Sequence, residues 1–288
     1  MNIDNSLNPD INILVCCHKQ DFFISQNDFF PIHVGKELSN IDLGIQGDNT
    51  GDNISALNPN YCELTAHYWY WKNMPVAKYV GLNHYRRYFS FSKRLSKGIP
   101  YYNMSVSEIN TSDATKLPDL DKIFKHYDII LAKPNVYPYS LGVDYSVSHS
   151  QNDIIKLGKI IDDLYPEYAT SFNTVIFSNN KLAHYNMFIM KGQMFKHYSE
   201  WLFSILAEAQ KRIPAPSDPV QGRIYGYMAE RLLNVYAYHH RLKIKYTPVI
   251  KVCDEPNATS FAQKFRAILQ MYRNNIAAWL TRPRLKPQ

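Results

Sequence analysis

Short apolar runs rich in β-branched residues alternate with stretches of helical periodicity, and this alternation most constrains the fold. The runs Ile11–Cys17, Tyr79–Asn83, Tyr127–Pro134 and His184–Gly192 are predicted to be buried strands. Residues 149–165 and the stretch from Gly192 through Gln210 carry apolar residues at helical spacing. Strands that alternate with helices favour an α/β domain with a mainly parallel sheet.

The segments between these runs carry loop and capping signals. Residues 35–58 are rich in Gly, Asp and Asn, which predicts a loop. Asn58 or Asn60 is expected to cap a helix that contains Pro59, with Glu63 completing a capping box. "RIPAPSDP" (212–219) predicts a second loop. It is followed by the helical segment "GRIYGYMAERLLNVYAYHHRL" and a last strand, "LKIKYTPVI".

The net charge of +7 is concentrated at the end of the chain. From Pro256 to Gln288 there are six basic residues and no acidic ones, so the remaining residues carry a charge of only +1. The near-neutral body argues against a nucleic-acid partner, although a His- and Arg-rich stretch in it keeps a phosphoester-binding alternative open. Tyr is abundant, with 22 residues, and its flat face and hydroxyl suit stacking on sugars or bases as well as core packing.

The basic tail has the pattern of an amphipathic helix. Its apolar residues fall at steps of three or four (Phe261, Phe265, Ile268, Tyr272, Ile276 and Leu280), and Lys264, Arg266 and Arg273 lie off that line. Such a helix is typical of proteins that lie on an anionic bilayer, and packing on the domain or on a partner is the alternative. There is no signal-peptide pattern and no apolar run of about 18 residues, and the four Cys form no disulfide pattern. We therefore expect a cytoplasmic protein at the inner face of the plasma membrane.

The stretch "YVGLNHYRRYFSF" ends an apolar run with one His and two Arg. If the chain stays extended, His84, Arg86 and Tyr88 share one face, and Tyr85, Arg87 and Phe89 share the other. Arg offers a planar fork of donors that suits phosphate oxygens. The alternative is that one Arg pairs with a buried carboxylate.

Familiar catalytic motifs are missing from the sequence. It contains no P-loop, G-x-G-x-x-G, H-E-x-x-H or G-x-S-x-G. It also lacks a D-x-D after an apolar strand, the metal–diphosphate motif of nucleotide-sugar transferases. "GDNTGDNIS" lacks the ligand spacing of a calcium loop, so a binding loop or a plain surface loop is expected there.

Three motifs together resemble a bacterial family of capsular, exopolysaccharide and O-antigen glycosyltransferases, formerly described only as a domain of unknown function. They are "YCELTAHYWYWKN", "YVGLNHYRRYF" and "GYMAERLLNVY", in this order. The resemblance runs from about Ile11 to Ile250 and implies a glycosyltransferase domain at 1–250 with a basic tail at 251–288. It implies a GT-A-like nucleotide-sugar-binding fold. It also implies transfer of a sugar from a nucleotide donor to a growing surface polysaccharide on a lipid-linked acceptor. Several members resemble galactofuranosyltransferases that use UDP-galactofuranose.

The resemblance also implies where the donor binds. Ligands of open α/β sheets lie at the carboxyl ends of the strands, which places His18 and Lys19 near the nucleotide. The other residues that we expect on the donor side are Asp52, Asn53, Ser55, Asn58, Glu63, Thr65, Asn83, His84, Arg86, Arg87, His184 and Asn186. His84, Arg86 and Arg87 occupy the place of the D-x-D and would bind the leaving diphosphate directly, so a metal-independent enzyme with no cofactor is expected. Asp128 and Asp144 keep the metal alternative open.

An inverting transferase needs a carboxylate that takes the proton of the acceptor hydroxyl. Glu230 is the first candidate and Asp144 the second, although an ion pair between Glu230 and a neighbour is the plainer interpretation. His149 and Arg223 are expected on the acceptor side. The main alternative function is a non-catalytic protein that binds a nucleotide sugar or a polysaccharide.

Overall fold

Strands from both halves of the chain form one sheet. The computed structural model describes residues 8–25, 28–92, 99–254 and 261–281. The main path of the sheet runs in the order β11 (Ile244–Thr247), β7 (Ile129–Ala132), β10 (Phe188–Lys191), β4 (Tyr79–His84), β1 (Ile11–Cys17), β2 (Phe29–His33) and β3 (Gln46–Gly47). Three further strands, β5 (Arg87–Phe89), β6 (Tyr101–Met104) and β12 (Val249–Val252), extend it off this path.

Most neighbours in the main path are parallel. β1 runs parallel to β2 and β4, β2 parallel to β3, and β11 parallel to β7. Only β10 runs against its neighbours, between β4 and β7. The prediction of an α/β fold with a mainly parallel sheet is therefore confirmed.

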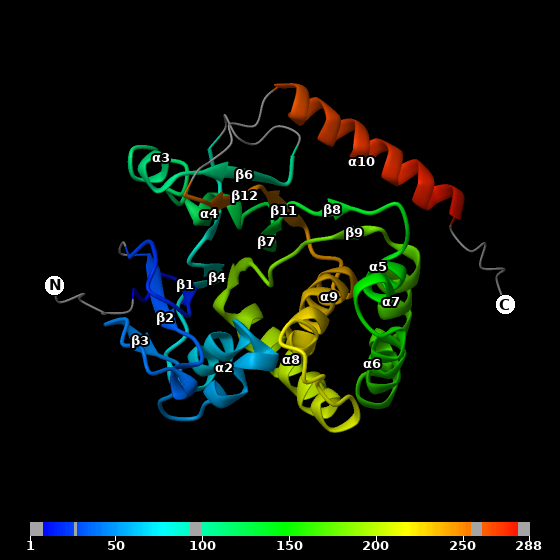
Figure 1. Cartoon of the computed structure of the whole chain (residues 1–288), viewed down its shortest axis with the longest axis horizontal. Coiled ribbons are helices and arrows are strands. Elements are labelled where there is room, and N and C mark those ends of the chain that lie inside the picture. Colours follow the sequence, from blue (N-terminus) through cyan, green and yellow to red (C-terminus); the bar gives the residue numbers. More distant parts are fainter. Residues whose placement is uncertain (1–7, 26–27, 93–98, 255–260, 282–288) are drawn as a thin grey trace.

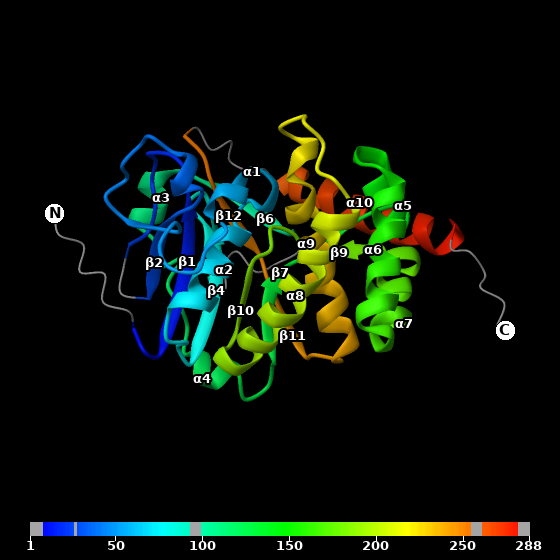
Figure 2. The same ribbon diagram turned by 90° about the horizontal axis from the view of Figure 1, so that it is seen from below.

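Both faces of the sheet are covered by apolar cores. The side chains of β1 alternate between these two cores. Leu14 and Cys16 pack on one side, and Ile13, Val15 and Cys17 pack on the other. The first side is covered by α2 (Leu64–Asn73) and α8 (Gly192–Arg212), and its apolar core continues into α9 (Ile224–His239) and α6 (Gln151–Leu164). The second is covered by β5 and β12 with α3 (Val106–Asn110) and α4 (Leu120–Ile123). Figures 1 and 2 show this arrangement, with α8 beside the strands and α6 farther out, beyond α8 and α9.

The long predicted helices are confirmed as α6, α8 and α9. Two predicted strands differ from the structure. The last one is divided at Pro248, which ends β11 and starts β12, because proline cannot donate a ladder hydrogen bond. The strand expected from His184 begins only at Phe188, since Tyr185 (φ 74°) and Asn186 (φ 52°) have left-handed backbone conformations.

Several short elements had no clear apolar pattern and were not predicted. They are β2, β3, β5, β6, β8 (Asn135–Val136), β9 (Lys181–Leu182), α3, α4, α5 (Leu141–Ser148) and α7 (Ala169–Asn173). Capping signals for two of them are nevertheless present in the sequence. Ser105 and Glu108 form a capping box at the start of α3, and the Ser140 hydroxyl accepts from the Val143 amide at the start of α5.

The predicted amphipathic helix is confirmed as α10 (Phe261–Thr281), but its apolar stripe faces solvent. Its exposed stripe consists of Phe265, Leu269, Tyr272, Ile276, Trp279 and Leu280, whose exposed fractions run from 45% to 70%. The inner face is mixed: Ile268 and Met271 are half-buried, Ala278 is buried, and Asn274 donates to the Val136 carbonyl at 2.7 Å. Arg282, Arg284 and Lys286 lie outside the described residues, as do the side chains of Phe261 and Lys264. No helix within the described ranges is long and apolar enough to cross a membrane.

Candidate functional site

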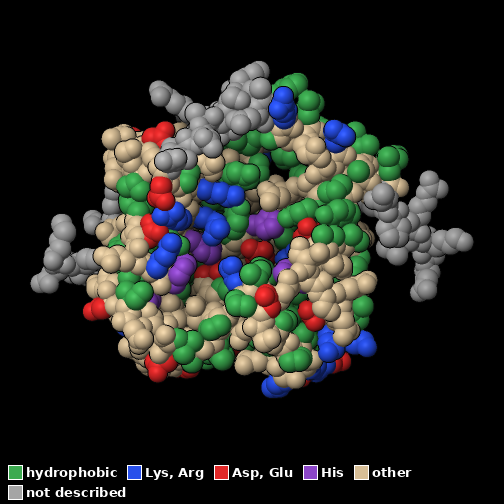
Figure 3. All heavy atoms as spheres, in the orientation of Figure 1, with side chains coloured by type: hydrophobic (Ala, Val, Ile, Leu, Met, Phe, Trp, Pro, Cys, Tyr) green, Lys and Arg blue, Asp and Glu red, His purple; other side chains and the backbone are tan. Residues whose placement is uncertain are grey.

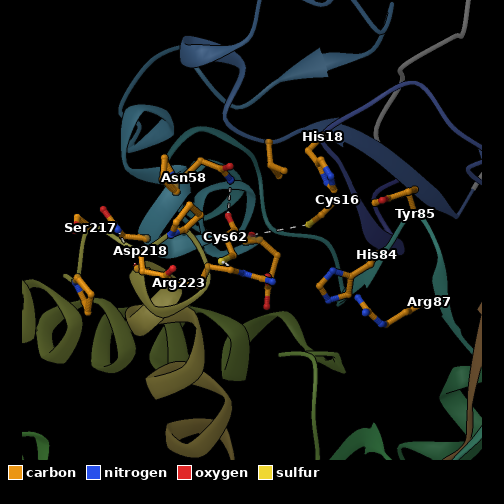
Figure 4. A pocket seen from close by; sticks show the side chains of 17 residues that line it. Cys16, His18, Asn58, Cys62, His84, Tyr85, Arg87, Ser217, Asp218 and Arg223 are labelled. Atoms are coloured by element: carbon orange, nitrogen blue, oxygen red, sulfur yellow. Dashed lines mark hydrogen bonds between the residues drawn. The ribbon is translucent and has the colours of Figure 1, made fainter. Parts of the chain in front are cut away.

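A cavity of about 560 Å³ opens at the carboxyl ends of β1 and β4. Four segments surround it: the end of β1 with the start of the loop after it, the turn after β4, the region from α1 (Asn58–Tyr61) to Glu63, and residues 216–223. Val34, just after β2, also lines it. Figure 4 shows Asn58, Cys62 and Arg223 on one side, with His18, Tyr85, His84 and Arg87 across from them. Charged and His side chains gather in the hollow at the centre of the face in Figure 3. The position is the one expected for a ligand of an open α/β sheet.

A hairpin brings His84 and Arg87 to the same side of the cavity. β4 ends at His84, β5 starts at Arg87, and the two residues are paired across the antiparallel ladder. Residues directly opposite each other in such a pair point to the same face. The expectation of one extended segment through Phe89 is therefore wrong. The turn at Tyr85 and Arg86 changes which side chains share a face.

Arg86 does not line the cavity, and its guanidinium is paired with two carboxylates. Its Nε lies 2.9 Å from Asp21 Oδ2, and one terminal nitrogen lies 3.1 Å from Asp21 Oδ1 and 3.2 Å from Asp254 Oδ1. This arrangement matches the structural alternative, in which one Arg of the pair binds a partly buried carboxylate. The guanidinium that the fold places at the cavity is that of Arg87.

Arg87 and Arg223 bring positive charge to the cavity. Neither forms an ion pair within the part of the chain that the structure describes. Arg87 stacks over the Tyr185 ring at 4.8 Å, and Arg223 Nε lies 3.2 Å from Cys62 Sγ. Burial raises the pKa of the Cys62 thiol to about 12, so Cys62 is a neutral partner. Glu63 and Asp218 also line the cavity, but neither lies within ion-pair distance of these two guanidinium groups, so both guanidinium groups remain free to bind an anionic ligand.

His84 enters the cavity as a neutral ring. Its Nε2 lies 2.8 Å from the Tyr185 carbonyl oxygen, which can only accept, so Nε2 carries the hydrogen. Burial lowers the pKa of His84, and burial together with nearby Lys19 and Arg223 lowers that of His18. At neutral pH these rings therefore add polarity but no charge. His84, Arg86 and Arg87 were expected to bind the diphosphate. Of these three residues, only Arg87 brings a positive charge to the cavity.

Glu63 lies in the cavity wall with a fixed orientation. Its side chain is 8% exposed, and its Oε1 accepts from Asn186 Nδ2 at 2.7 Å. The predicted capping box is absent, because Cys62 has a left-handed φ of 54° and separates α1 from α2. Glu63 thereby becomes the residue before α2, with its carboxylate turned to Asn186.

The loop predicted to contact the nucleoside is held by its own polar groups. Asp48 is fully buried and accepts from the Gly35 and Lys36 amides and from the Ser55 hydroxyl. Asp52 accepts from Tyr68, and Asn53 accepts from the Ser55 amide. These contacts stabilise the loop beside the cavity, and Asp52, Asn53 and Ser55 do not line it.

Glu230 and Asp144 belong to a partly buried polar network behind the cavity. Glu230 Oε1 accepts from the Tyr185 amide at 2.7 Å, and its Oε2 lies 3.4 Å from His184 Nδ1. Burial alone would raise the pKa of Glu230, but these donors and Arg231 lower it to about 2. Asp144 binds Arg231 at 2.9 Å. Neither carboxylate lines the cavity, and the ion-paired alternative for Glu230 matches this geometry.

The two residues expected on the acceptor side both lie against the Tyr227 ring. His149 stacks on it with 4.3 Å between ring centroids, and Arg223 lies 5.7 Å from its centroid. His149 also lines a second cavity, of about 540 Å³, which shares Pro216, Ser217 and Asp218 with the first. The loop at 216–218 therefore separates two adjoining hollows.

The structure thus brings together only part of the predicted set. His18, Asn58, Glu63, His84, Arg87 and Arg223 line the first cavity. The cavity lining does not include Lys19, Asp52, Asn53, Ser55, Thr65, Asn83, Arg86, His184 or Asn186. Sequence reasoning missed Cys16, Val34, Pro59, Asn60, Cys62, Tyr85, Pro216, Ser217, Asp218, Pro219 and Gly222. The Pro-rich composition of 212–219 was the one available signal for the loop residues.

The described residues contain no group of three or more His, Cys, Asp or Glu side chains arranged to hold a metal ion. Asp128, one of the two possible ligands, accepts from the Lys243 amide at 2.7 Å, and Asp144, the other, is paired with Arg231.

Comparisons with known proteins give one structural neighbour and one family. The neighbour is the apo structure of WbbM, described as a bifunctional glycosyltransferase; the two chains are 32% identical, with a TM-score of 0.78. The match covers 87% of this chain but only 46% of the other, so this chain spans about half the length of WbbM. No curated protein matches the chain. The sequence profile of a family described as domain of unknown function DUF4422 matches residues 12–241, and because this range is most of the chain, the chain belongs to that family.

Proposed function

We propose that this chain is a glycosyltransferase of surface-polysaccharide synthesis that takes its sugar from a nucleotide donor. The observation that carries the proposal is the cavity at the carboxyl ends of β1 and β4, where Arg87 and Arg223 have no carboxylate partner among the described residues. Two guanidinium groups that form no ion pair suit the oxygens of a nucleotide diphosphate. The similarity to a chain described as a bifunctional glycosyltransferase supports the same assignment.

The donor that we propose is UDP-galactofuranose, as the resemblance implies. The acceptor is a lipid-linked glycan, approached from the side of Arg223, His149 and the Tyr227 ring, since an aromatic face and polar donors suit a sugar. Arg87 binds the leaving diphosphate directly, so the reaction needs no divalent metal. The rival is a protein that binds a nucleotide sugar or a glycan without catalysis.

The test is a transfer assay with the purified chain. UDP-galactofuranose and its pyranose isomer are each supplied with a synthetic lipid-linked acceptor, and product is followed by mass spectrometry. The proposal expects an acceptor enlarged by one hexose and release of UDP. UDP binding without any transfer would favour the non-catalytic rival, and preference for the pyranose isomer would overturn the donor assignment alone.

We also propose that α10 holds the chain on the inner face of the plasma membrane. Its exposed stripe is apolar, Arg266 and Arg273 are exposed beside the stripe, and the sequence from Pro256 to Gln288 has no acidic residue. An apolar face flanked by cations complements an anionic bilayer better than it complements another protein surface of mixed charge.

Sedimentation with vesicles tests this attachment. The protein is expected to sediment with vesicles rich in phosphatidylglycerol and to remain in solution with pure phosphatidylcholine. Trp279→Ser with Leu280→Ser should release it, whereas Gln270→Ser, exposed on the same helix but off the stripe, should not. Unchanged sedimentation of the double variant, or of a chain that lacks Thr259 to Gln288, would exclude α10 as the attachment.

A further inference from the structure

Glu63 and Asp218 are the carboxylates that line the main cavity among the described residues. Asp218 holds the backbone of its own loop, because its Oδ1 accepts from the amides of Val220 and Gln221 at 3.0 and 2.8 Å. Glu63 is different: only its Oε1 has a hydrogen-bond donor, Asn186, within the described chain. Glu63 Oε2 is therefore a carboxylate oxygen in a partly enclosed cavity that is available to accept a proton.

The surroundings of Glu63 fix its carboxylate in place. Asn186 Nδ2 donates both to Glu63 Oε1 at 2.7 Å and to the Gly226 carbonyl at 3.1 Å, so it links the start of α2 to α9. Asn186 itself has a left-handed φ of 52°, and Cys62, just before Glu63, has one of 54°. Two non-glycine residues in this sparsely populated region on either side of one carboxylate indicate a geometry that the fold maintains against local strain.

Glu230, which sequence reasoning placed first as base, has a different environment. Both of its oxygens face donors, namely the Tyr185 amide, His184 and Arg231, and it does not line the cavity. Donors that stabilise the ionised form oppose proton uptake. This environment suits a residue that positions Tyr185 and His184 better than one that removes a proton from a substrate.

We propose that Glu63 is the catalytic base of the transfer reaction. The inference rests on the proposed function. The acceptor hydroxyl oxygen forms a bond to the anomeric carbon, and the bond between that carbon and the diphosphate oxygen breaks, with its electron pair leaving on UDP. The hydroxyl proton passes to Glu63 Oε2. Arg87 and Arg223 bind the charge that develops on the diphosphate.

Asn186 acts as a positioning residue in this assignment. Its hydrogen bond leaves Oε2, rather than Oε1, as the oxygen that receives the proton. The role of Glu63 in transfer is thereby separated from nucleotide binding, because UDP is bound by the arginines and not by the carboxylate. Removing the carboxylate should lower turnover and leave UDP affinity in place.

The experiment compares Glu63→Gln, Glu63→Asp and Glu230→Gln with a control exchange outside the cavity, Glu208→Gln, on α8. Turnover is measured in the transfer assay, and UDP affinity by calorimetry. Glu63→Gln should lose about 100-fold or more in kcat with UDP affinity within about threefold of the parent, because a general base contributes rate and not ground-state binding. Glu63→Asp keeps a carboxylate and should retain more activity than Glu63→Gln. Glu208→Gln should behave as the parent.

Each other outcome contradicts the assignment. Near-parent turnover of Glu63→Gln would exclude a base at this position, as would loss of UDP affinity in parallel with turnover, which would make Glu63 a donor-binding residue. A larger loss in Glu230→Gln than in Glu63→Gln, with UDP binding retained in both, would return the role to Glu230. If Glu63→Gln does not fold, Glu63→Asp decides, since equal kcat loss and UDP-affinity loss there overturns the proposal. Absence of transfer by the parent protein would instead contradict the proposed function itself.

Discussion

His84 and Arg87 face each other across the turn between β4 and β5, and both side chains line the main cavity. The two residues between them form the turn, and Arg86 is directed to Asp21 and Asp254 instead. Arg86 and Arg87, although adjacent in the sequence, therefore have different structural roles. One holds the hairpin in place, and the other brings charge to the cavity.

Replacing Arg86 should affect stability rather than ligand binding. Arg86→Ala removes a bidentate pair to Asp21, whose side chain is 11% exposed, and the weaker contact to Asp254. Because Arg86 is itself 32% exposed, we expect a loss of only about 1 kcal/mol in the free energy of unfolding, measured in urea. Arg266→Ala, exposed on α10, is the control and should change it little. Loss of UDP affinity in Arg86→Ala without loss of stability would contradict this division.

The centre of the fold was predictable because its central strands and its long helices carry clear apolar patterns. Ile11–Cys17 and the segments of α6, α8 and α9 have long apolar patterns that tertiary packing reinforces. The short strands β5 and β12 are defined by pairing with each other, at Val249 with Phe89, and no local pattern encodes this contact. The apolar stripe of α10 faces solvent because the opposite face of the helix packs on other parts of the chain, such as β8. The helix sequence alone does not specify this orientation.

The site was predictable only in part, because turns decide which side chains converge. Sequence alternation assigned His84 and Arg86 to one face, and a two-residue turn moved Arg87 there instead. Cys62 and Asn186 have positive φ angles that could not be predicted from the sequence. These two backbone conformations set the position of Glu63. The loop at 216–223 reaches the cavity from a distant part of the chain, as when Asn60 donates to the Gly222 carbonyl.

Nucleotide binding should not require a metal. The charge for the diphosphate comes from Arg87 and Arg223, so UDP should raise the melting temperature equally with EDTA and with added Mn²⁺. The measurement is a thermal-shift titration of the purified chain in both buffers. A shift that occurs only with Mn²⁺ would show that a metal ion takes part in donor binding.

Acid should destabilise the fold through His67. This residue is fully buried against Phe188, Phe195 and Phe203, and burial lowers its pKa from 6.5 to about 3. Because the unfolded chain takes up the proton first, this contribution to stability is complete above pH 6.5 and is lost as the pH falls from 6.5 toward 3.

His67→Gln should therefore flatten the decline of unfolding free energy over that interval, even if its stability at pH 7.5 is lower than that of the parent. His126→Gln, at an exposed position, should keep the parent slope. Urea unfolding at several pH values measures both. An unchanged slope in His67→Gln would mean that other groups govern acid sensitivity.

The central claim is that Arg87 makes the main cavity a diphosphate site, and calorimetric titration with UDP and with uridine tests it most directly. The parent protein and Arg86→Ala should bind UDP much more tightly than uridine. Arg87→Ala should lose about tenfold or more in UDP affinity, since hydrogen bonds to charged groups contribute roughly 1.5–3 kcal/mol, and its uridine affinity should be unchanged. Parent-like UDP affinity in a folded Arg87→Ala variant would contradict the account.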